Sequence, residues 1–494
     1  MIKIKKIIFF TIKSGLALVT LLTIVLFFYA AFFFEPPSVE KKTVENEAIK
    51  SEKLSDIEEE KRLRKEEEQR LKKAQAQKKI KVKTSIEDGL YATVGNKAIT
   101  KSDIINEIKL ILILTNKTFS EDKMDMGLLI SDNSCSVAGV FTKSSLVSPS
   151  VTVNRETIAA GGSVRGLVVN SGIANAGVGE QGYIDAKEMA SIAADGLGVK
   201  PDEVLVFSTG VIGVELPMTL IKKGVDEIKL SDDGGNFLAR SMMTTDTRTK
   251  ETGVIVNLGG TDVNICGVAK GSGMIHPNMA TMLCFVATDA AVDQDFLRSA
   301  LPDIADSTLN MLDIDGDTST NDTLLCMANG IAGNRRITRG GLGEGVLERA
   351  LTRVMRELAL KIVADSEGAK KLVEIRVDGA RTIGEARKVA FTVANSKLVK
   401  TAFFGEDPNV GRFMMAVGNA GVPVVEKTID IALGRVRVVR RGVAVGTREA
   451  AAAKVMQRSS FTVRISLGMG DARTSVWTSD LGFEYVRINS DYRT

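Results

Sequence analysis

The chain has 494 residues, of which 44% are hydrophobic and 26% are charged, and its formal net charge is +4 at pH 7. This near balance, together with one tryptophan and five tyrosines, excludes the basic excess and the aromatic platform expected of a nucleic-acid-binding protein. The single histidine, His276, excludes a two-histidine zinc site within one chain, and the four cysteines show no C-x-x-C spacing, so no metal is expected.

The amino-terminal region predicts a membrane anchor. Residues 14–34 carry no charged side chain, and a run of this length crosses a hydrocarbon core of about 30 Å. A cleaved signal peptide is the less favoured alternative, because the run ends in three phenylalanines instead of a small-residue cleavage site. We therefore expect residues 1–34 to form a basic segment and a transmembrane helix, which would attach the chain to the inner membrane.

Two further segments separate this anchor from the main body of the sequence. Residues 35–84 are almost wholly polar, and oppositely charged side chains four positions apart predict a charged helical linker. Within residues 85–118 a short strand, a Gly-Asn turn and a helix opened by Thr100 are expected. This segment resembles the start of membrane-anchored, SurA-like periplasmic chaperones, although no prolyl isomerase domain follows it.

From about Met124 onward, the sequence predicts an α/β protein with mixed β-sheets layered with helices, because short β-rich runs alternate with amphipathic segments. Helical periodicity indicates helices over residues 185–195 and 346–363. The predicted strands are Gly166–Asn170, Val204–Phe207, Val254–Leu258, Leu372–Val377 and Phe461–Ile465.

Three short motifs have more than one interpretation. Residues 177–182 read GVGEQG, but no strand runs into the first glycine, so a glycine-rich turn is favoured over a dinucleotide site. Residues 313–322 read DIDGDTSTND, which lacks the spacing of a calcium loop and either lines an active site or caps a helix through Thr318 or Ser319. Residues 208–213 follow an apolar run, and this turn either is structural or presents a hydroxyl and an N–H to a developing negative charge.

A chain with one imidazole has few routes to an activated nucleophile. A Ser-His-Asp site could be built only around His276. A threonine at a newly formed amino terminus needs no imidazole, because its own α-amine serves as the base. Thr281 is the candidate for this role, provided that the chain is cut after Ala280.

Several motifs follow one another between Met124 and the end of the sequence. They are STGVIG at 208–213, MTTDT at 243–247, GVAKGSGM at 267–274 with ATML at 280–283, DGDTSTNDT at 315–323, SEGAKK at 366–371, GEDPNVGR at 405–412 and INSDYRT at 488–494. In type and order, these motifs resemble those of the ornithine acetyltransferase family of arginine biosynthesis, and the resemblance extends from near Met124 to Thr494.

The resemblance implies a self-cleaving, DmpA-like fold and a specific reaction. Cleavage between Ala280 and Thr281 would give an α chain over residues 119–280 and a β chain over residues 281–494, with two copies of each in the assembly. Thr281 would take the acetyl group of N2-acetyl-L-ornithine and pass it to L-glutamate. No cofactor is implied, although acetyl-CoA is a second acetyl donor in bifunctional members, and the catalytic part is expected in the cytoplasm.

Residue roles follow from the same resemblance. Thr209 and Gly210 would stabilise the oxyanion, and His276 is interpreted as a packing or loop residue, with assistance of self-cleavage as its alternative. Two other functions stay open: a self-cleaving aminopeptidase of related fold, and an inactive acetyltransferase fused to a chaperone fragment. The implied substrate contacts are Thr247, Lys270, Thr281, Glu367, Asn489 and Thr494.

Overall fold

The computed structural model describes residues 90–94, 97–100, 124–276 and 282–491. The chain divides into two units, Met1–Lys101 and Ser102–Thr494. Within the described residues no helix is both long and apolar enough to cross a membrane. The predicted anchor at residues 14–34 and the predicted linker at 35–84 lie outside the described residues.

In the first unit, the described residues form an antiparallel pair of strands. Strand β1 (Leu90–Val94) pairs with β2 (Lys97–Thr100), with Val94 opposite Lys97. The predicted strand is present here, but β2 was not expected. The helix predicted after Thr100 falls outside the described residues.

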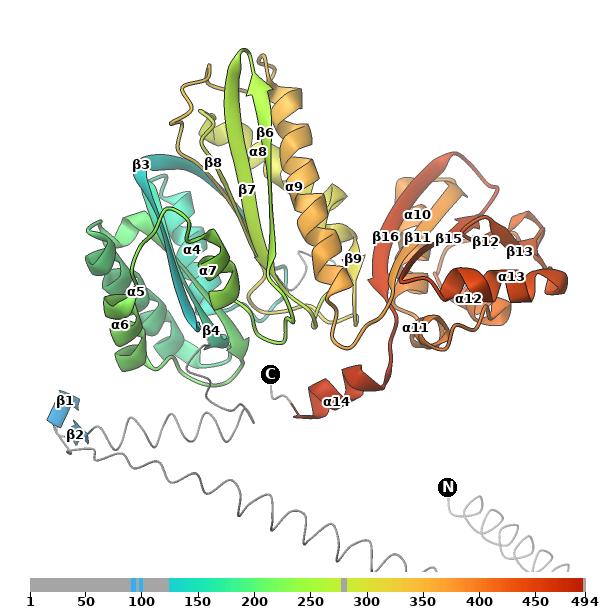
Figure 1. The fold of residues 1–494 in the computed structure, drawn as a ribbon, viewed down its shortest axis with the longest axis horizontal. Helices are drawn as coiled ribbons and strands as arrows, with labels where there is room; N and C mark the ends of the chain where they lie inside the picture. The colour runs from blue at the N-terminus through green and yellow to red at the C-terminus, as the bar shows by residue number, and fades with distance from the viewer. Residues whose placement is uncertain (1–89, 95–96, 101–123, 277–281, 492–494) are drawn as a thin grey trace, which may run out of the picture. The chain divides into compact units, whose positions relative to one another are not determined.

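The described part of the second unit contains two seven-stranded mixed sheets (Figure 1). The first sheet has the order β5-β4-β3-β10-β8-β7-β6, with parallel pairing only between β4 and β5 and between β8 and β10. Its strands are β3 (Met126–Phe141), β4 (Val164–Ile173), β5 (Val204–Val211), β6 (Lys250–Leu258), β7 (Thr261–Lys270), β8 (Leu283–Thr288) and β10 (Thr323–Ala328).

The second sheet has the order β14-β13-β12-β15-β11-β16-β9 and is also mixed, since β11 runs parallel to β15 and β16 runs parallel to β9. Its strands are β9 (Leu312–Asp313), β11 (Leu372–Ala380), β12 (Asp430–Leu433), β13 (Val436–Arg440), β14 (Val443–Ala444), β15 (Ser460–Ser466) and β16 (Ala472–Ser479).

Helices cover these sheets because alternate strand residues point to opposite faces. In β8, Cys284 and Val286 pack in the core under α8 and α9, whereas Phe285 packs in the core under α7. The helices are α4 (Pro149–Ala159), α5 (Gly179–Leu197), α6 (Met218–Glu227), α7 (Gly235–Ser241), α8 (Gln294–Ser307), α9 (Glu344–Ala364), α10 (Ile383–Ala394), α11 (Lys397–Phe404), α12 (Val410–Gly418), α13 (Glu449–Met456) and α14 (Phe483–Asp491).

The strands and helices predicted from Met124 onward are confirmed. The five predicted strands lie within β4, β5, β6, β11 and β15, and the two predicted helices lie within α5 and α9. The glycine-rich motif at 177–182 forms a turn that leads into α5, and Gly177 and Gly179 have positive φ angles of 68° and 66°. Mixed sheets layered with helices are therefore the observed architecture.

The segment that connects the two sheets lines the cavity described below. Strand β9 belongs to the second sheet, and the next strand, β10, belongs to the first. The chain from Ile314 to Asp322 thus passes from one sheet to the other. A segment that crosses in this way carries its polar side chains into the space between the two layers.

Candidate active site

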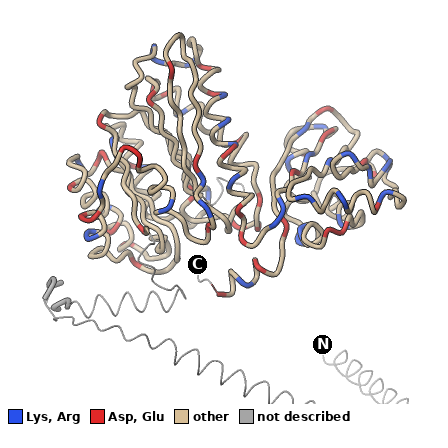
Figure 2. Tube along the Cα trace, in the orientation of Figure 1, with Lys and Arg blue, Asp and Glu red and all other residues tan. Residues whose placement is uncertain are grey.

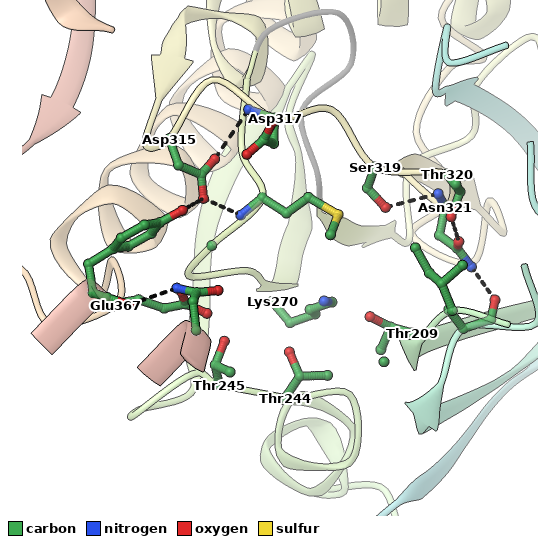
Figure 3. A pocket seen from close by; sticks show the side chains of 17 residues that line it. Thr209, Thr244, Thr245, Lys270, Asp315, Asp317, Ser319, Thr320, Asn321 and Glu367 are labelled. Atoms are coloured by element: carbon green, nitrogen blue, oxygen red, sulfur yellow. Dashed lines mark hydrogen bonds between the residues drawn. The ribbon is translucent and has the colours of Figure 1, made fainter. Parts of the chain in front are cut away.

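A cavity of about 180 Å³ lies where chain segments from the two sheets meet (Figure 3). Four segments contribute most of its wall: the end of β5, the end of β7, the crossing segment after β9, and α14. The described residues that line it include Thr209, Gly210, Lys270, Asp315, Asn321, Glu367, Tyr485 and Asn489.

Five of the residues singled out in the sequence line this cavity: Thr209, Gly210, Lys270, Glu367 and Asn489. Thr247 is not among the lining residues. Its backbone N–H donates to Asp365 Oδ2 at 3.0 Å, and its hydroxyl donates to Asp365 Oδ1. Ala280, Thr281 and Thr494 lie outside the described residues.

The end of β5 is shaped by a position that only glycine can occupy. Gly210 has a φ of 130°, and an added Cβ would lie 2.2 Å from the carbonyl carbon of Gly172 on the neighbouring strand β4. The Asn321 side-chain amide holds the strand from the other side by donating to Ser208 O at 2.8 Å and to Ala174 O at 2.6 Å. The buried Thr209 hydroxyl and its neighbouring peptide are thereby fixed at the cavity.

Lys270, the last residue of β7, is the cationic group of the cavity. Burial lowers the pKa of its ammonium, and the carboxylate of Asp246 opposes that shift. Asp246 is itself anchored, because it accepts from Lys250 Nζ at 2.5 Å and from the Gly271 N–H at 2.7 Å. Lys250 Nζ also donates to Asp365 Oδ2 at 2.6 Å, so a buried ionic network supports Lys270 from behind.

Acidic side chains gather at the other end of the cavity. Glu367 accepts from Asn489 Nδ2 at 2.6 Å, which ties α14 to the segment after α9. Asp315 accepts from the Met274 N–H at 2.5 Å and from the Tyr485 hydroxyl at 3.2 Å. Burial raises the pKa of Asp315 to about 6. Figure 3 shows these carboxylates on the far side of Lys270 from Thr209.

This arrangement suits acyl transfer. A hydroxyl and a peptide at a buried strand end can stabilise a tetrahedral oxyanion, and one cation opposite carboxylates can orient an amino acid by its two charges. Within the described residues, no group of three or more histidine, cysteine or acidic side chains is placed to hold a metal ion.

Comparisons with known proteins decide the family. Residues 113–494 match the family model described as the ArgJ family. The chain belongs to the ArgJ family. The arginine biosynthesis bifunctional protein ArgJ of Dehalococcoides mccartyi is 43% identical over 378 residues, covering 76% of this chain and 93% of the relative. Its counterpart in Symbiobacterium thermophilum is 46% identical over 374 residues, covering 75% and 93%.

Solved structures of the ArgJ family are similar over parts of the chain. A crystal structure of the bifunctional ArgJ protein from Bacillus halodurans is 38% identical, with a TM-score of 0.41, and covers 42% of this chain and 98% of that chain. The ornithine acetyltransferase of Mycobacterium tuberculosis, complexed with ornithine, is 27% identical with a TM-score of 0.27, and covers 31% and 83%.

Family membership confirms the enzymatic prediction and leaves part of the amino-terminal one without support. The protein is an acetyltransferase of arginine biosynthesis. Neither an aminopeptidase nor an inactive fusion gains support from these relatives. The family match begins at residue 113, and the comparisons give no support to a chaperone-like fragment over residues 85–118.

His276 is not among the residues that line the active-site cavity. Its Nδ1 is 2.7 Å from Asp313 Oδ1, and its ring faces Phe391 edge-on at a centroid distance of 6.1 Å. It lines a separate cavity of about 870 Å³ together with Arg387 and Lys388. Both interpretations of the histidine stay predictions, because the cleavage site at Ala280 and Thr281 lies outside the described residues.

Several lining residues had not been singled out individually. The acidic, hydroxyl-rich segment at 313–322 had two open interpretations, and the lining of the cavity by Asp315, Ser319 and Asn321 supports the active-site one. Tyr485 had no signal in the sequence, because a lone tyrosine in an amphipathic helix is ordinarily a packing residue.

Proposed function

We propose that the cavity transfers the acetyl group of N2-acetyl-L-ornithine to L-glutamate through an acetyl ester on Thr281. The chain first cleaves itself between Ala280 and Thr281, which frees the α-amine of Thr281 to act as its base. The observation that carries this proposal is the convergence of Thr209, Gly210, Lys270, Glu367 and Asn489 on one cavity from distant chain segments.

In the first half-reaction, the Thr281 hydroxyl gives its proton to the α-amine and attacks the acetyl carbonyl carbon. The carbonyl oxygen becomes an oxyanion that Thr209 and Gly210 stabilise. The C–N bond to ornithine breaks, the protonated amine returns the proton to the leaving nitrogen, and ornithine departs. In the second half-reaction the amine of glutamate attacks the carbonyl carbon of the acetyl ester, and the ester C–O bond breaks. The α-amine of Thr281 passes a proton from the glutamate nitrogen to the Thr281 oxygen, which restores the hydroxyl and releases N-acetylglutamate.

Other residues bind the two substrates in this proposal. Lys270 binds a carboxylate of the substrate and Glu367 binds an ammonium, because charge-assisted hydrogen bonds are strong between these groups. Asn489 positions Glu367 through its 2.6 Å hydrogen bond. Thr247 and Thr494 complete the contacts by resemblance. A second acetyl donor, acetyl-CoA, an assembly of two α and two β chains, and a cytoplasmic location for the catalytic part belong to the same proposal.

Intact mass and amino-terminal sequencing test this function. Purified wild-type protein is expected to yield a fragment that begins Thr-Met-Leu-Cys, and Thr281→Ala is expected to remain a single uncut chain. Incubation of the cut protein with N2-acetyl-L-ornithine is then expected to add one acetyl group to the fragment that begins with Thr281. An uncut wild-type chain, or acetyl transfer by Thr281→Ala, would contradict the proposal.

A further inference from the structure

The described lining of the active-site cavity carries unequal numbers of charges. Lys270 is the cationic side chain of this lining. Three carboxyl side chains also line the cavity: Asp315, Asp317 and Glu367. The proposed function uses Lys270 and Glu367. The excess of acidic groups indicates that one end of the cavity is built for a cationic part of a ligand.

Asp315 is held in place more firmly than a solvent-exposed carboxyl. Its Oδ2 accepts from the Met274 N–H and the Tyr485 hydroxyl, and its Oδ1 accepts from the Ile275 N–H at 2.8 Å. These donors come from the segment after β7 and from α14. The position of the Asp315 charge in the cavity is therefore fixed by two separate elements.

The acidic groups form one end of the cavity, distinct from the Lys270 end. Burial and then the carboxyls of Asp315, Glu367 and Asp317 raise the pKa of Tyr485, so all three lie near its hydroxyl. At the other end, the carboxyls that act on Lys270 are Asp246, Asp322 and Glu367, and Asp315 is not among its principal influences. Glu367 thus lies between the two ends, and Asp315 marks the acidic end.

We propose that Asp315 is a specificity-determining residue that selects an acetyl donor whose side chain ends in an ammonium group. The inference rests on the proposed function, in which the donor is acetylornithine. With the acetyl group at Thr209 and Gly210 and the donor carboxylate at Lys270, the side-chain ammonium extends to the acidic end. The field of a fixed carboxylate favours a cation there without a new hydrogen bond.

The same charge acts in the opposite sense on the acceptor. Glutamate carries a carboxylate where ornithine carries an ammonium, so Asp315 opposes its binding. Neutralising Asp315 is therefore expected to weaken the cationic donor and strengthen the anionic acceptor. Opposite changes in two Michaelis constants distinguish a charge effect from a general disturbance of the site, which would weaken both.

Initial-rate kinetics of Asp315→Asn test this inference. Two donors are compared, N2-acetyl-L-ornithine and its uncharged analogue N-acetyl-L-norvaline. We expect the KM of the cationic donor to rise about tenfold, the KM of glutamate to fall, and the KM of the uncharged donor to change little. Equal losses for the two donors would overturn the inference and assign Asp315 to loop structure alone.

Asp306→Asn is the matched control, because this carboxyl lines the separate cavity beside His276. It is expected to leave all three Michaelis constants unchanged. Self-cleavage of each variant is followed by intact mass. If wild-type protein cleaves and transfers acetyl groups but Asp315→Asn weakens both donors equally, the specificity inference alone fails. If wild-type protein does neither, the proposed function fails.

The wild-type protein offers a second measurement that needs no substitution. Because the pKa of Asp315 is raised to about 6, lowering the pH from about 8 to 5 converts its carboxylate to the neutral acid. The ratio of kcat/KM for the cationic donor to that for the uncharged donor should then fall. A ratio that stays constant over this range would also overturn the inference.

The groups that face Asp315 in this titration are limited in number. Tyr485 contacts it from α14, and Asp317 acts on it from its own segment, while Glu367 from the segment after α9 acts on Tyr485. The buried ammonium of Lys400 on α11 also interacts with it. Asp315→Asn distinguishes the titration of Asp315 from that of the other groups. In this variant, the ratio of kcat/KM for the cationic donor to that for the uncharged donor is expected not to depend on pH.

Discussion

The two sides of the active-site cavity are built in different ways. One side, which we call the strand wall, consists of Thr209, Gly210 and Lys270 at the ends of β5 and β7. The other side, the loop wall, consists of Asp315, Glu367, Tyr485 and Asn489. The strand wall is part of a buried sheet, whereas the loop wall is held by hydrogen bonds between side chains and to loop backbone.

The contrast is clearest in what supports each wall. Lys250 is fully buried behind the strand wall and neutralises two carboxylates. Helix α14 in the loop wall has no buried residue among those described, and Phe483 is 82% exposed. Charged residues of both signs lie along this helix (Figure 2). The strand wall is therefore supported by a buried sheet and buried ion pairs, whereas the loop wall depends on a few polar contacts.

The largest expected effect comes from Lys250→Met, which removes the cation between Asp246 and Asp365. Two carboxylates would then be buried without their countercharge, and breaking a buried ion pair costs about 3–5 kcal/mol of unfolding free energy. Denaturant unfolding measures this loss. Lys361→Met is the control, since the Lys361 side chain is 40% exposed beside Glu357 and its loss should change stability little. Equal free energies of unfolding for the two variants would contradict the prediction that buried ion pairs stabilise the strand wall.

Thr209→Ala is expected to act on the chemical step without comparable loss of stability. Removing one donor to an oxyanion lowers kcat by about 10²–10³-fold, because the missing hydrogen bond matters most in the transition state. Single-turnover measurement of ornithine release from acetylornithine checks this. Thr209→Ser keeps the hydroxyl and should retain most of the rate; an alanine variant with wild-type kcat would exclude the hydroxyl from the oxyanion site.

Asn489→Ala in the loop wall should have the smallest effect. It removes the 2.6 Å hydrogen bond to Glu367, and one such bond contributes about 0.5–1.5 kcal/mol. We therefore expect a several-fold rise in the KM of acetylornithine with an unchanged melting temperature. Ser490→Ala, one residue further along the exposed helix, is the control. A large loss of thermal stability in Asn489→Ala would show that α14 supports the fold and not only the site.

Much of the fold could be predicted because buried strands and helices have characteristic patterns of apolar residues in the sequence. The runs at 166–170 and 204–207 are apolar because both faces of β4 and β5 are covered, and the segment at 346–363 has helical period because one side of α9 is buried. Lys270, Glu367 and Asn489 were identified through motifs alone. Thr209 and Gly210 also had a local signal, because their turn follows the apolar run at 204–207.

Other features had no local signal. Thr247 stays a predicted substrate contact, and its hydroxyl donates to Asp365, which lies 118 positions away. Tyr485 reaches Asp315 across 170 positions. Contacts of this separation depend on how β9, α9 and α14 meet, and no window of sequence contains them.

The sequence was enough to predict the family, five of the strands and two of the helices, because motifs and hydrophobic periodicity involve residues that lie close together along the chain. The tertiary structure alone decided which of those side chains share a cavity, that Lys250 supports Lys270 through Asp246, and that Asp315 lies at an acidic end opposite the strand wall. Charge and burial act through space, and the fold brings residues more than 100 positions apart to within hydrogen-bonding distance.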